Sequence, residues 1–210
     1  MCVMSTRELH IISNGQNELE RFVWIAERTH TYVTAFHLRE KFSTAATLWH
    51  GVMALKAGGV PIHKVIINDR VDVAWAAQTG GVQLAYHSLQ VQEVRRSFPG
   101  LRIGCSVHSV EEADDMSKYG ADFLLYGHIF ASNSKLNQEP RGIALLKEVV
   151  DRVQVPIIAI GGIQPEHVQQ VIGTGATGIA ILSGITSAPD PIQAVKDYRR
   201  ELDAGGGKGR

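Results

Sequence analysis

Residues 156–184 read PIIAIGGIQPEHVQQVIGTGATGIAILSG, and their alternation sets the pattern for the whole chain. Two short apolar runs, Pro156–Ile160 and Gly178–Leu182, enclose a helix-patterned segment at Pro165–Ile172. Short, β-rich apolar runs predict strands, and an alternation of strand and helix is typical of a parallel sheet covered by helices. The stretch therefore predicts a strand–helix–strand unit.

The same alternation continues on the amino-terminal side and on to the end of the chain. The other predicted strands are Leu9–Ser13, Tyr32–Leu38, Lys64–Ile67, Gly81–Ala85, Arg102–Val107 and Phe123–Ile129. The other predicted helices are Asn17–Arg28, Thr44–Ala57, Val71–Gln78, Leu89–Phe98, Val110–Tyr119, Ile143–Arg152 and Pro191–Leu202. Ser43 is the expected cap of the second helix, Pro165 suits a first turn, and Gly58, Gly120 and Gly173 follow helix ends.

Eight strands and eight helices without a break in composition favour one closed α/β domain, a single (β/α)8 TIM barrel. We expect an amino-terminal extension at 1–8, the barrel at 9–202 and a flexible tail at 203–210. An open doubly wound sheet is the alternative. Residues 173–178, GTGATG, match the spacing of a dinucleotide fingerprint, which needs a strand before it and a helix after it. Here the order is reversed, so we expect a helix-to-strand turn and no nicotinamide cofactor.

The composition excludes several classes of protein. Among 210 residues, 21 Lys and Arg balance 21 Asp and Glu, so no net field favours nucleic acid or a membrane surface. Cys2 and Cys105 make neither a disulfide framework nor a zinc site. No secretory signal and no apolar run of about 20 residues are present, so we expect a cytoplasmic protein without a membrane partner.

Polar and glycine residues gather where the predicted strands end, which is the active-site face of a barrel. Gly161 and Gly162 end the seventh strand and Gly184 follows the eighth. Such glycines let backbone N–H groups approach an anion, so they indicate a phosphate site; the alternative is that they only permit tight turns. Arg39 and Lys41 after the second strand, with Lys135 after the sixth, would add positive charge, unless they are solvated or paired surface charges.

Four histidines, His37, His87, His108 and His128, fall near strand ends, where a ring could reach a ligand. His128 follows an alternation, Leu124-x-Tyr126-x-His128, that points one face into the barrel. Imidazole can accept and return a proton at neutral pH, although a hydrogen-bonded structural histidine is the alternative. His10, early in the first strand, is expected to be packed or on the surface. No cluster of ligands indicates a dedicated metal site.

These strand ends also carry a resemblance to a known family. The motifs are Leu38-Arg39-Glu40-Lys41, Asn68-Asp69-Arg70, Gly104-x-Ser106-x-His108, the loop to Lys135, and Ala159-Ile160-Gly161-Gly162-Ile163. In order and in register with the strands, over about 9–198, they resemble the thiamin phosphate synthase superfamily. In the synthase, the resemblance implies, a pyrimidine diphosphate and magnesium are held by the region matching His37–Lys41, Asn68, Asp69, Ser106 and Lys135.

Two departures distinguish the chain from the synthase pattern. Ser88 stands where a second magnesium-binding aspartate is expected, and Gly127-His128 replaces a Gly-Pro after the sixth strand. Loss of a carboxylate should weaken a site for a hard cation. The chain is thereby similar to the thiazole tautomerase (TenI) branch of the superfamily.

That branch implies an isomerase of thiamin biosynthesis, which aromatises a carboxythiazole phosphate tautomer without metal or cofactor. The resemblance implies that His128 is catalytic and that the enzyme is a homodimer. The implied substrate-binding residues are Arg39, Lys41, Asn68, Ser106, Ser132, Asn133, Ser134, Lys135, Gly161, Gly162, Leu182, Ser183 and Gly184. Either Lys135 or Arg39 would face the substrate carboxylate. The alternatives are a thiamin phosphate synthase, which is a transferase, and a non-catalytic regulatory protein that binds the thiazole phosphate.

Overall fold

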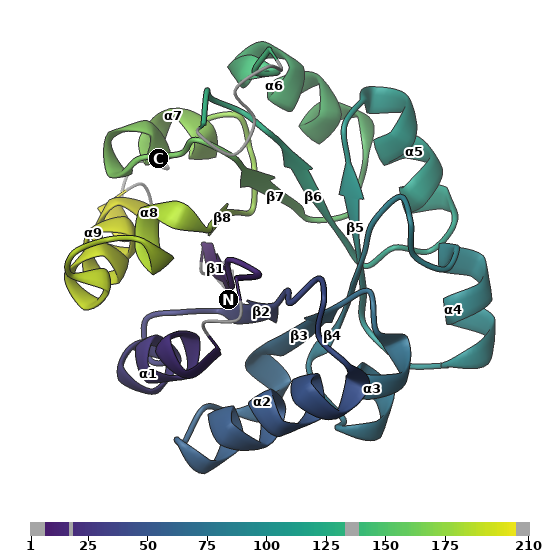
Figure 1. Ribbon diagram of the computed structural model, residues 1–210. Coiled ribbons are helices and arrows are strands. Elements are labelled where there is room, and N and C mark those ends of the chain that lie inside the picture. The colour runs from purple at the N-terminus through teal and green to yellow at the C-terminus, as the bar shows by residue number, and fades with distance from the viewer. Residues whose placement is uncertain (1–6, 17–18, 133–138, 205–210) are drawn as a thin grey trace, which may run out of the picture.

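The computed structural model describes residues 7–16, 19–132 and 139–204, and within them the strands close into a parallel barrel (Figure 1). Each strand pairs with the next along the chain, and β8 pairs with β1, which closes the ring. The strands are β1 Glu8–Ile12, β2 Ala35–Leu38, β3 Val65–Asn68, β4 Gly81–Leu84, β5 Ile103–Val107, β6 Phe123–Gly127, β7 Ile157–Ile160 and β8 Gly178–Ile181. The predicted (β/α)8 TIM barrel is confirmed, and the open sheet is excluded.

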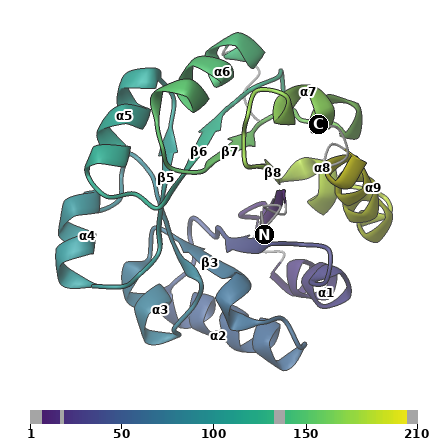
Figure 2. The ribbon, with the colours of Figure 1, turned by 180° about the vertical axis from the view of Figure 1, so that it is seen from behind.

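The helices surround the barrel in chain order, as Figures 1 and 2 show from opposite sides. They are α1 Leu19–Thr29, α2 Ala45–Ala57, α3 Val71–Ala76, α4 Val91–Ser97, α5 Val110–Lys118, α6 Gly142–Arg152, α7 Val168–Ile172, α8 Ser183–Thr186 and α9 Pro191–Ala204. In the described part of the chain, the 3₁₀ turn η1 Ile62–Lys64 precedes β3, and the 3₁₀ turn η3 Pro165–His167 precedes α7. The short α8, directly after β8, is absent from the sequence prediction.

Two details at helix starts differ from the predictions. The cap of α2 is Thr44 and not Ser43, because the Thr44 hydroxyl accepts a hydrogen bond from the backbone N–H of Thr47. The predicted helix at Pro165–Ile172 begins as the 3₁₀ turn η3 and becomes α-helical only at Val168. The turn between α7 and β8 holds residues 173–177, so the GTGATG stretch joins a helix to a strand as predicted.

Side chains on the two faces of each strand enter two different apolar clusters. A large cluster lies between the sheet and the helices and includes Phe36, Leu38 and Val107. A smaller one is formed by the opposite faces of the strands: Ile12, Ala35, Ile66, Phe123, Leu125, Ile158 and Ala180. The buried polar side chains of His10, His37 and Gln83 share this second face because they alternate with the residues that face the helices.

The described residues contain no helix long and apolar enough to cross a membrane. β1 begins at Glu8, one residue before the predicted strand, and α9 extends to Ala204, two residues beyond the predicted helix. The residues on either side, 1–6 and 205–210, lie outside the described part of the chain.

Candidate active site

The expected site residues that the structure describes stand at or just beyond the carboxyl ends of the strands, at one mouth of the barrel. His128 follows the last residue of β6 and is only 3% exposed. The backbone N–H of Arg141 donates to the His128 carbonyl oxygen over 3.0 Å, and the next residue, Ile129, donates its N–H to the Ile160 oxygen over 3.0 Å. The backbone of His128 is thereby fixed to both the β7 end and the start of α6.

Gly161 lies directly against His128 and leaves no room for a side chain. Its φ is +101°, and an added Cβ would lie 2.3 Å from the His128 Cβ and 2.6 Å from its Cα. At Gly162, φ is +67° and a Cβ would meet the Phe130 carbonyl oxygen at 2.5 Å. Both positions thus require glycine for conformation and for packing. The tight-turn interpretation of these glycines is therefore sufficient to explain them, and a phosphate site there stays a prediction.

Tyr198 of α9 contacts the segments that follow β7 and β8. The Tyr198 hydroxyl donates to the Ile163 carbonyl oxygen over 2.9 Å, and a Cβ on Gly184 would lie 2.6 Å from the same hydroxyl oxygen. Burial, with a smaller contribution from the charge of Glu166, raises the pKa of Tyr198 to about 12, so the hydroxyl stays protonated as a donor. One side chain therefore contacts the two loops expected to bind phosphate.

Replacing Tyr198 by Phe should lower the free energy of unfolding by about 1–3 kcal/mol, because the buried Ile163 carbonyl loses its donor. Urea denaturation measures the change. The control is Tyr119→Phe, at a tyrosine that is 43% exposed, where we expect a change below about 0.5 kcal/mol. Equal losses in the two variants would contradict this role of the hydroxyl.

Among the described residues, Arg39 places a positive charge at the mouth, directly after β2. Its backbone N–H donates to the Ser13 hydroxyl over 2.8 Å, and its side chain is half-buried beside Gly15. Burial lowers the pKa of Arg39 and the charge of Glu40 partly offsets this, but a guanidinium remains charged in proteins. Lys41 is exposed. Ser13, which ends the first predicted strand, is a residue that sequence reasoning missed.

The loop after β6 lies only partly within the described structure. Ser132 is half-buried, whereas Asn133, Ser134 and Lys135 lie outside the described residues. Their expected contacts with the ligand therefore stay predictions.

Asn68 ends β3 and Ser106 lies near the end of β5, both half-buried. Between them, the Gln83 amide of β4 donates to the Ser106 hydroxyl over 3.0 Å. Asp69, next to Asn68, has a φ of +66°, a conformation that non-glycine residues adopt rarely and that is often found at functional sites. These side chains form a polar wall on the β3–β5 side of the mouth.

The residues present do not fit the magnesium site that the synthase resemblance implies. The Ser88 hydroxyl accepts a hydrogen bond from the backbone N–H of Ala85 over 3.0 Å, so it serves the turn after β4. Among the described residues, no group of three or more His, Cys, Asp or Glu side chains could hold a metal ion. Of the expected pair of carboxylates, the chain keeps only Asp69.

Of the other strand-end histidines, His108 and His37 have structural partners. His108 Nδ1 lies 2.9 Å from the carbonyl oxygen of Gly127, the residue before His128. His37 is fully buried, with Nε2 2.9 Å from Nδ1 of His10, so the expectation that its ring reaches a ligand directly is wrong. His87 is exposed beside Tyr86. The catalytic role expected of His128 stays a prediction.

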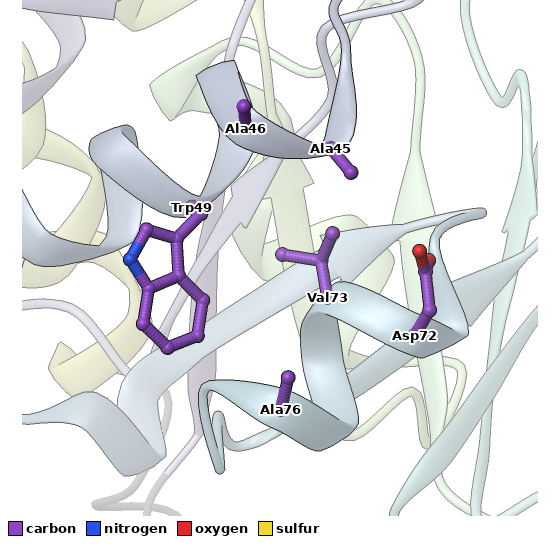
Figure 3. A pocket seen from close by; sticks show the side chains of 6 residues that line it. All are labelled: Ala45, Ala46, Trp49, Asp72, Val73 and Ala76. Atoms are coloured by element: carbon purple, nitrogen blue, oxygen red, sulfur yellow. The ribbon is translucent and has the colours of Figure 1, made fainter.

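A separate hollow of about 360 Å³ lies on the outside of the barrel between α2 and α3 (Figure 3). Its lining is Ala45, Ala46, Trp49, Asp72, Val73 and Ala76, which includes none of the expected site residues. We assign the candidate site to the mouth, where the polar side chains converge.

Comparison with known proteins identifies the family of this chain. Residues 9–185 match the TMP-TENI family, described as thiamine monophosphate synthase. A thiamine-phosphate synthase of Pyrococcus abyssi is 39% identical over 137 residues, 65% of this chain and 66% of the relative. One of Methanoculleus marisnigri is 41% identical over 147 residues, 69% of this chain and 70% of the relative. These alignments span about two thirds of each relative.

A solved structure has the same fold over nearly the whole chain. The thiamine phosphate pyrophosphorylase from Pyrococcus furiosus superposes with a TM-score of 0.82 at 28% identity, covering 96% of this chain and 98% of that one.

Proposed function

Because the chain belongs to the TMP-TENI family of thiamine monophosphate synthases, we propose that it acts in thiamine biosynthesis, as a thiazole tautomerase. The proposed substrate is a dihydrothiazole ethyl phosphate with a carboxylate on one ring carbon and an exocyclic double bond. The observation that carries the proposal is His128, a nearly buried imidazole held at the mouth between the ends of β6 and β7. Thus the proposed enzyme is an isomerase.

The proposed reaction needs one group that takes and returns a proton. Neutral His128 removes the proton from the ring carbon that bears the carboxylate, and the electron pair left behind joins the ring. The exocyclic double bond shifts into the ring, and the imidazolium returns the proton to the exocyclic carbon. Atoms and charge balance, and the aromatic product supplies the driving force. The chain has Ser88 in place of the second carboxylate of the synthase's magnesium site, and no step of this scheme is routed through a metal.

The phosphate would bind at the ends of β7 and β8. We assign it to the backbone N–H groups around Gly162, Leu182, Ser183 and Gly184, with the Ser132–Ser134 loop alongside. The support is the arrangement of these loops: the segments after β7 and β8 both lie against the Tyr198 hydroxyl and are therefore close to each other. The phosphate anchors the substrate while the ring carbon faces His128.

The substrate carboxylate would face a cation, and Arg39 is the described candidate. Replacing Arg39 by Met should raise the KM roughly 10- to 100-fold, the loss of one charge-assisted hydrogen bond. Steady-state kinetics measures the change, with Arg28→Met in the last turn of α1 as the control. An unchanged KM in Arg39→Met together with a raised KM in Lys135→Met would assign the carboxylate to Lys135 instead.

A thiamine-phosphate synthase, a transferase, is the second candidate, favoured by the names of the relatives and by the presence of Asn68 and Asp69. The test is to incubate the purified protein with the thiazole phosphate tautomer in the presence of EDTA and follow aromatisation by ultraviolet absorbance. The proposal expects full turnover. Binding without turnover would instead indicate the non-catalytic regulatory protein, and activity only in coupling reactions with magnesium would indicate the synthase.

A further inference from the structure

Three polar side chains form a continuous hydrogen-bonded chain through the barrel interior, from β1 to β2. Glu8 Oε2 lies 2.8 Å from His10 Nε2, and His10 Nδ1 lies 2.9 Å from His37 Nε2. Both imidazoles are fully buried, and Phe123 packs edge-on against each of them. Arg102 stands at the Glu8 end, 3.7 Å from the same carboxylate oxygen. The proposed proton transfer by His128 uses none of these groups.

The chain fixes which nitrogen of each ring carries a proton. Burial alone would raise the pKa of Glu8, but the His10 hydrogen bond and the Arg102 charge outweigh it and keep the pKa below its usual value. Burial lowers the pKa of His10 and places that of His37 well below its usual value, so both rings are neutral near pH 7.

An ionised Glu8 can only accept, so His10 carries its proton on Nε2 and accepts at Nδ1. His37 must then donate from Nε2, which leaves its Nδ1 as a lone pair with no proton. The negative charge of Glu8 thus determines, through His10, that Nδ1 of His37 is a hydrogen-bond acceptor.

The lone pair of His37 lies beside the end of β3. His37 pairs with Ile66 in the β2–β3 register, and Asn68 follows two residues later on the same face of β3, near enough to act on the His37 ring. Within the described part of the chain, His37 Nδ1 and Asn68 Oδ1 both lack a hydrogen-bond partner, although both atoms are buried. Buried polar atoms call for a partner, but two acceptors cannot pair, so the Asn68 amide must be turned to bring an N–H to the His37 lone pair.

We propose that His37 is a positioning residue for Asn68: its Nδ1 accepts one amide N–H of Asn68 and so presents the rest of that amide to the ligand at the mouth. Glu8 and His10 act indirectly: they keep the His37 proton on Nε2, so that Nδ1 accepts. The amide that is presented offers its second N–H to an anionic group of the ligand, such as a carboxylate. This inference rests on the proposed function for the identity of the ligand, but not for the state of His37.

The state of His37 is measured in the ligand-free protein by two-dimensional ¹H–¹⁵N NMR of its histidine rings. We expect the Nε2–H form for His10 and for His37, with assignments from the variants His10→Gln and His37→Gln. A proton on Nδ1 of His37, or a charged His37 ring at pH 7, would overturn the inference, whether or not the protein turns over the thiazole tautomer.

The effect on the ligand is measured as the affinity for the aromatic carboxythiazole phosphate. We expect His37→Leu to weaken binding about tenfold, the worth of one hydrogen bond, with little change in kcat. His37→Gln should restore most of the affinity, because its amide can donate to His10 while its carbonyl accepts from Asn68. In an Asn68→Ala background, His37→Leu should have no further effect. Additive losses, or equal losses in His37→Leu and His37→Gln, would show a structural role only.

Discussion

In the variant His128→Asn, kcat for aromatisation of the thiazole phosphate tautomer should fall by about 10²- to 10⁴-fold, the usual contribution of a general acid–base group. Asn approximates the shape of the imidazole but cannot take up and return a proton. The backbone at this position is held by hydrogen bonds from Arg141 and through Ile129, and the substitution leaves both intact. A stopped-flow ultraviolet assay under saturating substrate measures the loss.

The matched control is His87→Asn, at an exposed histidine that follows β4 and whose ring lies against Tyr86. We expect its kcat to stay within about twofold of the unsubstituted enzyme, which is near the limit set by small surface effects. The affinity for inorganic phosphate should be unchanged in both variants. Full turnover in His128→Asn would show that another group moves the proton.

The second large effect is expected at Gly161. Gly161→Ala combines a positive φ with an overlap of the new methyl group on the Cα and Cβ of His128, at 2.6 and 2.3 Å. We expect the free energy of unfolding to fall by about 2–5 kcal/mol, from about 1–2 kcal/mol of backbone strain and about 1–3 kcal/mol of overpacking. Because the relief of the overlap must move His128, kcat should fall as well.

Gly100→Ala separates the two contributions. Gly100 has a similar φ of +86°, but a Cβ there would meet no atom within 4 Å. It should show only the strain, about 1–2 kcal/mol in urea denaturation, with kcat unchanged. Equal destabilisation of the two variants would mean that the Gly161–His128 contact is not tight in solution.

Much of the barrel could be predicted from the sequence because strand length and alternation determine which residues end each strand. The glycines after β7 follow from that pattern. The predicted inward face of β6 was wrong, because Leu124 and Tyr126 pack between the sheet and the helices, whereas Phe123 and Leu125 face the barrel interior. Helix starts were less certain: Thr44 and Ser43 are both good caps, and only the contact of Thr44 with the Thr47 N–H distinguishes them.

The interior pairing of His10 with His37 could not be predicted. It depends on the register in which Ile12 lies opposite His37, so that His10 becomes its diagonal neighbour on the inner face. Likewise, the support of Arg39 by the Ser13 hydroxyl joins residues 26 positions apart across two strands. Single-strand patterns contain no signal for contacts of this type.

The proposed tautomerase activity is tested most directly by comparing tautomerisation and synthase coupling in one preparation of the protein. The value of kcat/KM is measured for aromatisation of the tautomer with EDTA, and for coupling of pyrimidine diphosphate to thiazole phosphate with magnesium. We expect kcat/KM for tautomerisation to exceed that for coupling by about 10³-fold or more, a difference of about 4 kcal/mol in transition-state stabilisation. Efficient magnesium-dependent coupling with negligible tautomerisation would contradict it.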